Sequence, residues 1–439
     1  MQHVVVVTME NRSFDHFLGW LRGADGRQAG LSFTDHSGSA HATYPLAPDY
    51  TGCGHPDPDH SYGPSRVAWN NGAMDGFLRA GSNDVYSIGY YTEPDLPFLG
   101  ALAQHYLVCD RCFASILGPT FPNRMFLWAA QTDRLDDSVS TTSLPTIFDS
   151  LSAAGVSHRY YFNNLPFLAL WSGKYVSSTS LFQDFLTDAA SGALPAVSFI
   201  DPTYTLLDNG TGNDDHPHAD IRNGEAFLAA IFQALAGGPA WPGTVLIITF
   251  DEWGGFFDHV PPPRAAAPNN VDQDLVNGQA LLGFRVPAIV VSPFTRNQAP
   301  FLMASREAAD GYAAAPGFTP RPPRRRSPAA LVNHTVFDHT SVLKLIEWRW
   351  GLPPLTARDG SPQIGNLAVA MNFSAPDSTV PALPNPAPVG PQPCSRAGSR
   401  LAGVEAEPQV QQSPWTALAG SPAAQDWLQH PNFRRRIPQ

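Results

Sequence analysis

Continuous runs of apolar and β-branched residues recur along the chain at the length of β-strands. They cover residues 3–8 (HVVVVT), 196–200 (AVSFI), 244–250 (TVLIITF) and 286–291 (VPAIVV). A strand that lacks alternating polar positions is buried on both faces, as in a parallel sheet covered by helices. These runs therefore predict the central strands of a mostly parallel sheet.

Amphipathic patterns with the helical period lie between these runs. They cover residues 96–103, 223–236 and 340–350. Alternation of strands with helices favours an arrangement in which helices cover both faces of the sheet. We therefore predict the α/β fold class, with a three-layer αβα sandwich around the sheet.

The pattern changes after residue 373. Residues 374–393 are rich in proline and show no periodicity, which predicts a linker or a surface tail. We therefore divide the chain into one folded domain, residues 1–373, and a Pro-rich linker and C-terminal tail, residues 374–439. Residues 313–328, which end in PRPPRRRSP, predict an exposed loop insertion.

Composition and charge exclude several classes of partner and segment. The net charge is −11 and basic residues form no long face, so nucleic acid is not an expected partner. No run of about 18 apolar residues predicts a transmembrane helix. The first predicted strand begins at residue 3 and leaves no room for a signal peptide, so we expect none in this sequence and leave the location of the protein open.

The four cysteines are too few for a disulfide scaffold at this chain length. Cys109 and Cys112 have CxxC spacing, but a zinc site needs a second pair or suitably spaced histidines. We therefore interpret these two residues as half-buried cysteines beside a helix.

Polar residues follow each predicted strand at once. In chain order they are Glu10-Asn11, Asp201, Asp251-Glu252 and Ser292-Pro293. Ligands of open α/β sheets bind beyond the carboxyl ends of the strands, so the acids among these residues are predicted to converge there. A single acid in such a place is more often a helix cap, whereas the acid–amide and acid–acid pairs favour a site.

The two pairs suit a hard divalent cation. Asp251 and Glu252 are adjacent carboxylates, which repel each other unless a cation or a proton lies between them. Glu10 and Asn11 offer a carboxylate and an amide oxygen. Oxygen ligands of this kind favour Mg²⁺, Ca²⁺ or Mn²⁺ over Zn²⁺.

A hydroxyl group is presented in the segment GPTFPNR, residues 118–124. Thr120 lies between two prolines, and Asn123 and Arg124 follow closely. Metal coordination lowers the pKa of a hydroxyl, and a guanidinium holds phosphoryl oxygens in a fork. Two interpretations are equally well supported by these residues alone. In one, Thr120 is a nucleophile; in the other, the segment is a simple turn and Asn123 caps the next helix.

Histidines are concentrated in two acid-rich loops. His55 and His60 lie in GHPDPDH, and His216 and His218 lie in DDHPHAD. Histidine gives a proton to a leaving group, or takes one from water, near neutral pH. The same four side chains could instead form a second metal site.

Several motifs, in this order, resemble one protein family. ENRSFDH, GPTFPNR, DDHPHADI and TFDEWGGFFDHVPPP are similar to motifs of the bacterial phosphoesterase family, and MDGF and CDRCFAS fit the same family. That family holds phosphatidylcholine-type phospholipases C and respiratory-burst-inhibiting acid phosphatases. The resemblance covers roughly residues 1–355 and implies an alkaline-phosphatase-like core.

The resemblance also implies roles for particular residues. Thr120 matches the nucleophile, which also contacts the metal, and His216 matches an active-site histidine. Trp253 stands where the family often has a small or polar residue. By the same resemblance the metal ligands are Glu10, Asn11, Thr120, Asp251 and Glu252, and the further catalytic candidates are His60, His218 and His259. Arg124 and Asn123 are added as catalytic candidates because they follow Thr120 so closely.

We therefore predict a phosphoric ester hydrolase that works through a phosphothreonine with a divalent metal ion, Ca²⁺, Mg²⁺, Mn²⁺ or Zn²⁺. His216 or His60 is expected to protonate the leaving oxygen. Phospholipid or phosphocholine-type esters are the expected substrates. The alternatives are an acid phosphatase acting on soluble phosphomonoesters and a catalytically silent metal-binding relative. A sulfatase is disfavoured, because no cysteine or serine has the context needed to become formylglycine.

Contact with lipid is expected to be transient. Larger phospholipases C have extra C-terminal domains, and this sequence has only residues 374–439 in their place. Aromatic residues could line an approach for lipid tails or pack in the core. They are Trp69, Phe77, Phe121, Trp253, Phe256 and Phe257.

Overall fold

The computed structural model describes residues 1–206, 210, 212–296, 330–394 and 413–434. The loop insertion predicted at 313–328 lies outside these residues. An eight-stranded sheet, in the order β14-β6-β13-β10-β1-β9-β7-β8, forms the centre of the molecule. The strands are β1 (His3–Met9), β6 (Leu107–Cys109), β7 (His158–Phe162), β8 (Thr179–Leu181), β9 (Val197–Ile200), β10 (Thr244–Phe250), β13 (Ala288–Val291) and β14 (Leu331–Asn333).

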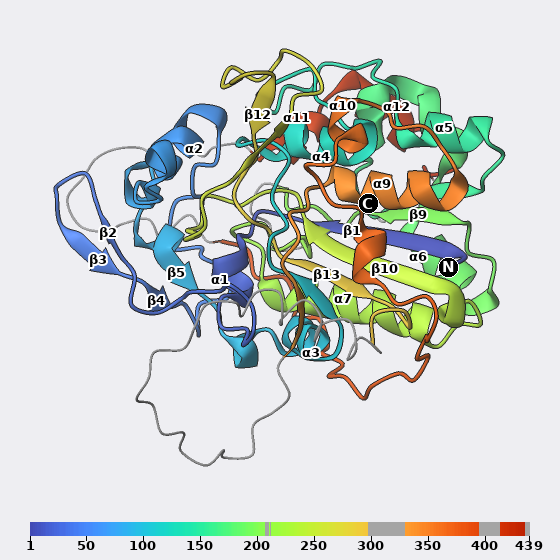
Figure 1. Cartoon of the computed structure of the whole chain (residues 1–439), viewed down its shortest axis with the longest axis horizontal. Coiled ribbons are helices and arrows are strands. Elements are labelled where there is room, and N and C mark those ends of the chain that lie inside the picture. Colours follow the sequence, from blue (N-terminus) through green and yellow to red (C-terminus); the bar gives the residue numbers. More distant parts are fainter. Residues whose placement is uncertain (207–209, 211, 297–329, 395–412, 435–439) are drawn as a thin grey trace.

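Helices cover both faces of this sheet. Figure 1 shows α3 (Pro97–His105) and α7 (Ile221–Ala236) below it, and α4 (Thr120–Ala129), α5 (Ile147–Ala153) and α9 (Thr340–Trp350) above it. The predicted three-layer α/β sandwich is therefore confirmed. The helices expected at 96–103, 223–236 and 340–350 correspond to α3, α7 and α9.

The sheet is mostly parallel, and β13 is the exception. β10 and β6 both pair with β13 in the antiparallel direction, whereas the other pairs of the sheet are parallel. Ser292 therefore leaves β13 at the opposite edge from the acids, and its hydroxyl donates to the carbonyl of Thr244 at the start of β10. The position of Ser292 was not predictable, because an apolar run carries no information about strand direction.

Shorter elements complete the described chain. Three two-stranded sheets pair β2 (Ser32–Thr34) with β3 (Ala40–Ala42), β4 (Tyr44–Pro45) with β5 (Gly89–Tyr90), and β11 (Arg264–Ala266) with β12 (Gln279–Leu281). The remaining α-helices are α1 (Phe14–Leu18), α2 (Tyr62–Trp69), α6 (Phe182–Ser191), α10 (Ala357–Gly360), α11 (Pro414–Ala419) and α12 (Pro422–Leu428). Within the described residues no helix combines the length and the apolarity needed to cross a membrane.

The strands that carry the site are deeply buried. Val4 to Val7 in β1 have no exposed surface, and every residue of β10 is buried. α4 is also buried along its whole length, including its polar residues Thr120, Asn123 and Arg124. Apolar contacts of this kind supply most of the stability of a fold, and they fix the ends of β1, β10 and α4 relative to one another.

Cys109 and Cys112 lie in the core. Cys109 ends β6 and is fully buried, and Cys112 follows it with 6% of its surface exposed. Both are free thiols. The expectation of half-buried cysteines beside a helix is wrong, because the CxxC segment continues a central strand rather than a surface helix.

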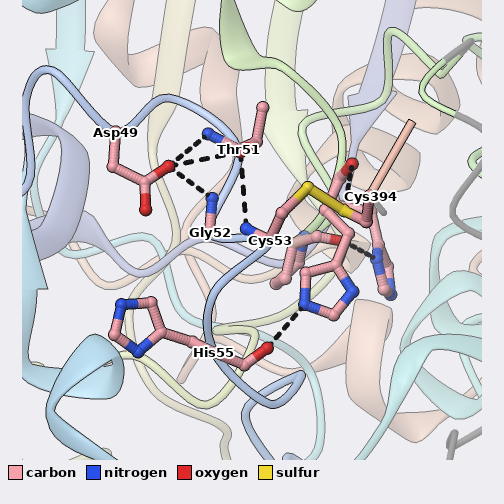
Figure 2. The surroundings of a disulfide bond; sticks show 9 residues. Asp49, Thr51, Gly52, Cys53, His55 and Cys394 are labelled. Atoms are coloured by element: carbon pink, nitrogen blue, oxygen red, sulfur yellow. Dashed lines mark hydrogen bonds between the residues drawn. A yellow bond between two sulfur atoms is a disulfide. The ribbon is translucent and has the colours of Figure 1, made fainter. Parts of the chain in front are cut away.

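A single disulfide joins the remaining cysteines, Cys53 and Cys394, which are 341 residues apart. Figure 2 shows the bond beside a tight loop, in which the carboxylate of Asp49 accepts hydrogen bonds from the backbone N–H groups of Thr51 and Gly52. The bridge fastens the Pro-rich tail to the loop that carries His55 and His60. No local pattern predicts this pairing, because the two cysteines are so far apart in the chain.

We expect reduction of this disulfide to destabilise the protein. Cross-linking such distant residues restricts the unfolded chain, and the loss of one disulfide typically costs about 2–5 kcal/mol. Melting temperatures should fall when the wild type is treated with a phosphine reductant. The Cys53→Ser/Cys394→Ser double variant is the control, because its remaining thiols are already free. Equal responses of the two proteins to reductant would contradict the prediction.

Candidate active site

The two pairs of polar residues lie side by side at the carboxyl ends of β1 and β10. These strands are parallel neighbours in which Met9 is level with Phe250. The residues that follow are therefore level too, and the backbone N–H of Asn11 donates to Oδ1 of Asp251 at 3.1 Å. Glu10, Asn11, Asp251 and Glu252 have no exposed surface.

Backbone contacts hold the loops at this edge together. The N–H of Arg12 donates to the carbonyl of Glu252, and the N–H of Glu10 donates to the carbonyl of Asp214. Gly254 has a φ of +61°, and a Cβ there would lie 2.0 Å from the carbonyl oxygen of Asn11. A side chain at position 254 would therefore separate the two loops.

Thr120 is the first residue of α4 and is fully buried. Its hydroxyl oxygen has no hydrogen-bond partner among the described residues. Asn123 braces the turn before it, because its amide accepts from the N–H of Ile116 and donates to the carbonyls of Gly118 and Pro119. The side chain of Asn123 thus holds the turn that positions Thr120. The amino end of α4 also favours negative charge at this point.

Arg124, the residue of α4 that follows Asn123, extends its side chain to the acids. Its guanidinium donates to Asp251 Oδ2 at 2.9 Å and to Asp201 Oδ1 at 3.0 Å, and it lies 3.4 Å from Glu10 Oε1. Its other contacts are to the hydroxyl of Tyr204 and to backbone carbonyls of β1. This differs from the expected fork around phosphoryl oxygens. The buried guanidinium is engaged with protein oxygens and orients the acids.

The oxygens at this edge are of the kinds that bind a divalent cation. Glu10 Oε2, Asn11 Oδ1, Thr120 Oγ1 and Glu252 Oε1 are all buried without a hydrogen-bond partner in the described chain. Burying such an atom unpartnered costs free energy, which a shared cation offsets. Carboxylate, amide and hydroxyl oxygens form a hard donor set.

The pKa values at this edge show the same excess of negative charge. Burial, and then the charge of Asp251, raise the pKa of Glu10 well above its usual range. Burial raises the pKa of Glu252 to about 8, although His60 opposes this shift. A proton or a cation must therefore accompany these carboxylates.

His60 lies against the acids. Its Nε2 is 3.1 Å from the amide nitrogen of Asn11 and 3.7 Å from Glu252 Oε1, and its Nδ1 is 2.8 Å from the carbonyl oxygen of Pro58. Burial lowers the pKa of His60, but the charges of Glu252 and Asp57 outweigh burial and raise it to about 9. The contacts with Asn11 and Pro58 hold the ring of His60 against the acids.

His216 lies in the loop that contacts Glu10 through Asp214. It is 3% exposed, and its Nδ1 is 2.6 Å from the carbonyl oxygen of Pro217. Its Nε2 has no hydrogen-bond partner among the described residues and lies 3.6 Å from a carboxylate oxygen of Asp57. A ring nitrogen in this position can exchange a proton with a bound molecule.

His218 and His259 lie elsewhere. Nε2 of His218 contacts the carbonyl oxygen of His55 at 3.0 Å, in the loop next to the disulfide. Nδ1 of His259 contacts Asp15 Oδ2. The structure does not bring either residue to the acids at the ends of β1 and β10, because both side chains turn toward other loops.

His259 belongs instead to an ion-pair cluster. Asp15, Asp258 and His259 are close enough together to hold a metal ion. The guanidinium of Arg285, however, donates to Asp15 Oδ1 at 3.0 Å and to Asp258 Oδ1 at 3.0 Å. A buried cation is thus already present, so we assign this cluster a structural role.

Three residues near the site were not predicted from the sequence. Asp57 faces His216. Asp137 accepts a hydrogen bond from the N–H of Phe121 at 2.7 Å, and burial raises its pKa to about 6. Trp415, in α11, donates its indole N–H to Glu10 Oε1 at 2.6 Å. The acid-rich loop around Asp57 was a signal, but nothing in the local sequence marks Asp137 or Trp415.

The aromatic residues considered for lipid contact pack mostly in the core. Trp253 is fully buried against Phe77 and Phe284, with ring centroids 5.8 Å and 4.6 Å away. Phe121, Phe256 and Phe257 also have no exposed surface, and Trp69 alone of the six is partly exposed. These buried side chains are thus core residues in this arrangement.

Comparison with known proteins identifies relatives. Non-specific phospholipase C6 of Arabidopsis thaliana is 33% identical over 323 residues, 66% of this chain and 61% of the plant protein, so the chain spans less than two thirds of that relative. Phospholipase C A of Mycobacterium tuberculosis is 31% identical over an alignment 459 positions long, gaps included, which covers 88% of this chain and 80% of that protein.

A solved structure and a family model were also matched. The phosphonate monoester hydrolase of Agrobacterium radiobacter shares 10% identity with a TM-score of 0.37, over 86% of this chain and 78% of that chain, which is too distant to inform function. Residues 1–353 match the model of the Phosphoesterase family. The resemblance seen in the motifs is confirmed, and the chain belongs to the phosphoesterase family.

Proposed function

We propose that the protein is a metal-dependent phosphoesterase that hydrolyses phosphate esters through a phosphothreonine on Thr120. The observation that carries this proposal is the group of buried, unpartnered oxygens on Glu10, Asn11, Thr120 and Glu252. A nucleophilic hydroxyl and three hard ligands together suit phosphoryl transfer. A role in structure alone would not need the hydroxyl.

The residues then divide into ligands and proton donors. Glu10, Asn11, Asp251, Glu252 and Thr120 would hold the cation, which when bound lowers the pKa of a hydroxyl and neutralises charge on phosphoryl oxygens. Arg124 orients Asp251 and Glu10 from behind. The helix dipole of α4 adds positive potential at Thr120.

In the first step Thr120, having released its hydroxyl proton to solvent, reacts as the alkoxide, which a bound cation would stabilise: Oγ1 bonds to phosphorus, and the bond from phosphorus to the alcohol oxygen breaks. His216 protonates the departing oxygen, and we favour it over His60 because its Nε2 has no partner in the described chain. In the second step water attacks the phosphothreonine and gives a proton back to His216. Phosphate, or a substituted phosphate, leaves and Thr120 is regenerated.

We propose phospholipids or phosphocholine-type esters as substrates. Support comes from the relatives, which are named phospholipases C. Soluble phosphomonoesters are the second candidate, because the aromatic side chains that could have formed an approach for lipid tails are mostly buried in the core. Contact with a membrane surface would then be transient.

Thr120→Ala should abolish turnover. Without the hydroxyl no covalent intermediate forms, and we expect a loss of at least about 10³-fold, equivalent to about 4 kcal/mol of transition-state stabilisation. Hydrolysis of phosphatidylcholine, phosphorylcholine and p-nitrophenyl phosphate should be measured with each protein. Thr120→Ser, which retains a hydroxyl, is the matched control and should keep measurable activity.

The three substrates also separate the candidate functions. Fastest turnover of phosphatidylcholine supports the phospholipase C assignment, and exclusive turnover of the two monoesters supports the acid phosphatase. Wild-type rates in Thr120→Ala would refute the phosphothreonine mechanism.

His216→Ala should reduce turnover by about 10²–10⁴-fold, the usual contribution of a general acid–base group. His218→Ala is the matched control, since it removes an imidazole from the same loop at a position away from the acids. It should reduce turnover by less than about tenfold. The turnover rates of the wild type and the two variants are compared on p-nitrophenyl phosphate and on an alkyl phosphate monoester. Equal losses in the two variants would remove His216 from the mechanism.

Removal of divalent metal should abolish activity and leave the fold intact. The buried carboxylates can take up protons when the cation leaves, so we expect little change in circular dichroism. Activity is measured after exhaustive dialysis against a chelator, and again after addition of Mg²⁺, Ca²⁺, Mn²⁺ or Zn²⁺. Full turnover by protein that elemental analysis shows to be metal-free would contradict the proposed function.

A further inference from the structure

The C-terminal segment 413–434 packs against the catalytic domain beside the site. It forms α11 and α12, and α12 lies on the helical segment Phe167–Ser178. Trp427 in α12 is 1% exposed, and its indole N–H donates to the backbone carbonyl of Ser172. Trp415 in α11 is fully buried.

The side chain of Trp415 lies among residues that flank the proposed metal site. Its ring stacks on Tyr204, with centroids 3.4 Å apart and planes inclined by 12°. The ring of Phe121, which follows the proposed nucleophile, is 5.3 Å away. The guanidinium carbon of Arg124 lies 5.0 Å from the ring centroid. These contacts leave the indole little freedom to move.

The single polar atom of this ring is directed at Glu10. The indole N–H donates to Oε1 at 2.6 Å, and Arg124 Nη2 lies 3.4 Å from the same oxygen. Oε2, the other oxygen, has no partner in the described chain. Two donors on one oxygen therefore fix the orientation of the carboxylate and leave the second oxygen for a cation.

We propose that Trp415 is a positioning residue for Glu10, and that the C-terminal segment is thereby a part of the active site. This inference rests on the proposed function, because Glu10 must be a metal ligand. Partners that hydrogen-bond to ligands set the orientation of the ligand, and their loss typically weakens metal binding by 10–100-fold. A tryptophan that only fills space would not affect metal binding in this way.

Trp415→Phe and Trp427→Phe test the two roles. Each variant keeps a large aromatic ring and removes one buried indole N–H from the same segment. Only the N–H of Trp415 reaches a proposed metal ligand. Mn²⁺ binding to the metal-free full-length proteins is measured by titration calorimetry. We expect Trp415→Phe to weaken binding about tenfold or more, and Trp427→Phe to bind within about twofold of the wild type.

Activity as a function of Mn²⁺ concentration gives a second measurement. The Trp415→Phe enzyme should need about tenfold more Mn²⁺ for half-maximal activity, and excess metal should restore most of its kcat. KM for the ester at saturating metal should change little. A Mn²⁺ dependence identical to that of the wild type would overturn the proposal and leave Trp415 as a packing residue.

Two further measurements distinguish failure of this inference from failure of the proposed function. If Trp415→Phe does not fold, 3-benzothienylalanine at position 415 keeps the bicyclic ring without the N–H, and the same tenfold weakening is expected. Wild-type protein that binds no Mn²⁺, Mg²⁺, Ca²⁺ or Zn²⁺ overturns both the proposed function and this inference. Wild-type protein that binds metal with the same affinity as Trp415→Phe overturns this inference alone.

Discussion

The burial of several carboxylates at one edge of the sheet is the constraint on which the site depends. Glu10, Asp251 and Glu252 have no exposed surface, and Arg124 brings a positive charge to the first two. Burial, and then the charge of Asp251, raise the pKa of Glu252 to about 8 although His60 opposes the shift, so a proton or a cation has to accompany this carboxylate. The tight loop contacts and the brace formed by Asn123 keep the oxygens close despite this repulsion.

The sequence predicted the four central strands of the sheet and missed the two outer strands on each side. β1 and β10 are seven residues long and apolar throughout, so burial on both faces was evident. β6, β8 and β14 have three residues each, too few to show a period, and β7 carries polar residues within HRYYF. The antiparallel direction of β13 was not predictable, because hydrophobic patterns are the same in either direction.

The site was predictable where the backbone decides which residues meet. Glu10 and Asp251 follow neighbouring parallel strands, so their proximity was expected from topology. His218 and His259 were expected at the acids but lie in other surroundings. In a loop, even the two residues that separate His218 from His216 suffice to turn its side chain to another surface. Arg124 was expected at the substrate, yet its position behind the acids depends on packing of α4 that no local pattern reveals. Trp415 contacts Glu10 across 405 residues and had no sequence signal.

The distance along the chain between Glu10 and Trp415 has a consequence for the order in which the protein becomes active. During synthesis the first strand and Glu10 leave the ribosome long before the segment that carries Trp415. With Trp415 in the role proposed above, the nascent chain could assemble its sheet and still bind metal only weakly. Hydrolysis of phosphate esters would then begin only after Trp415, 405 residues beyond Glu10, has been made, which limits premature action at the site of synthesis.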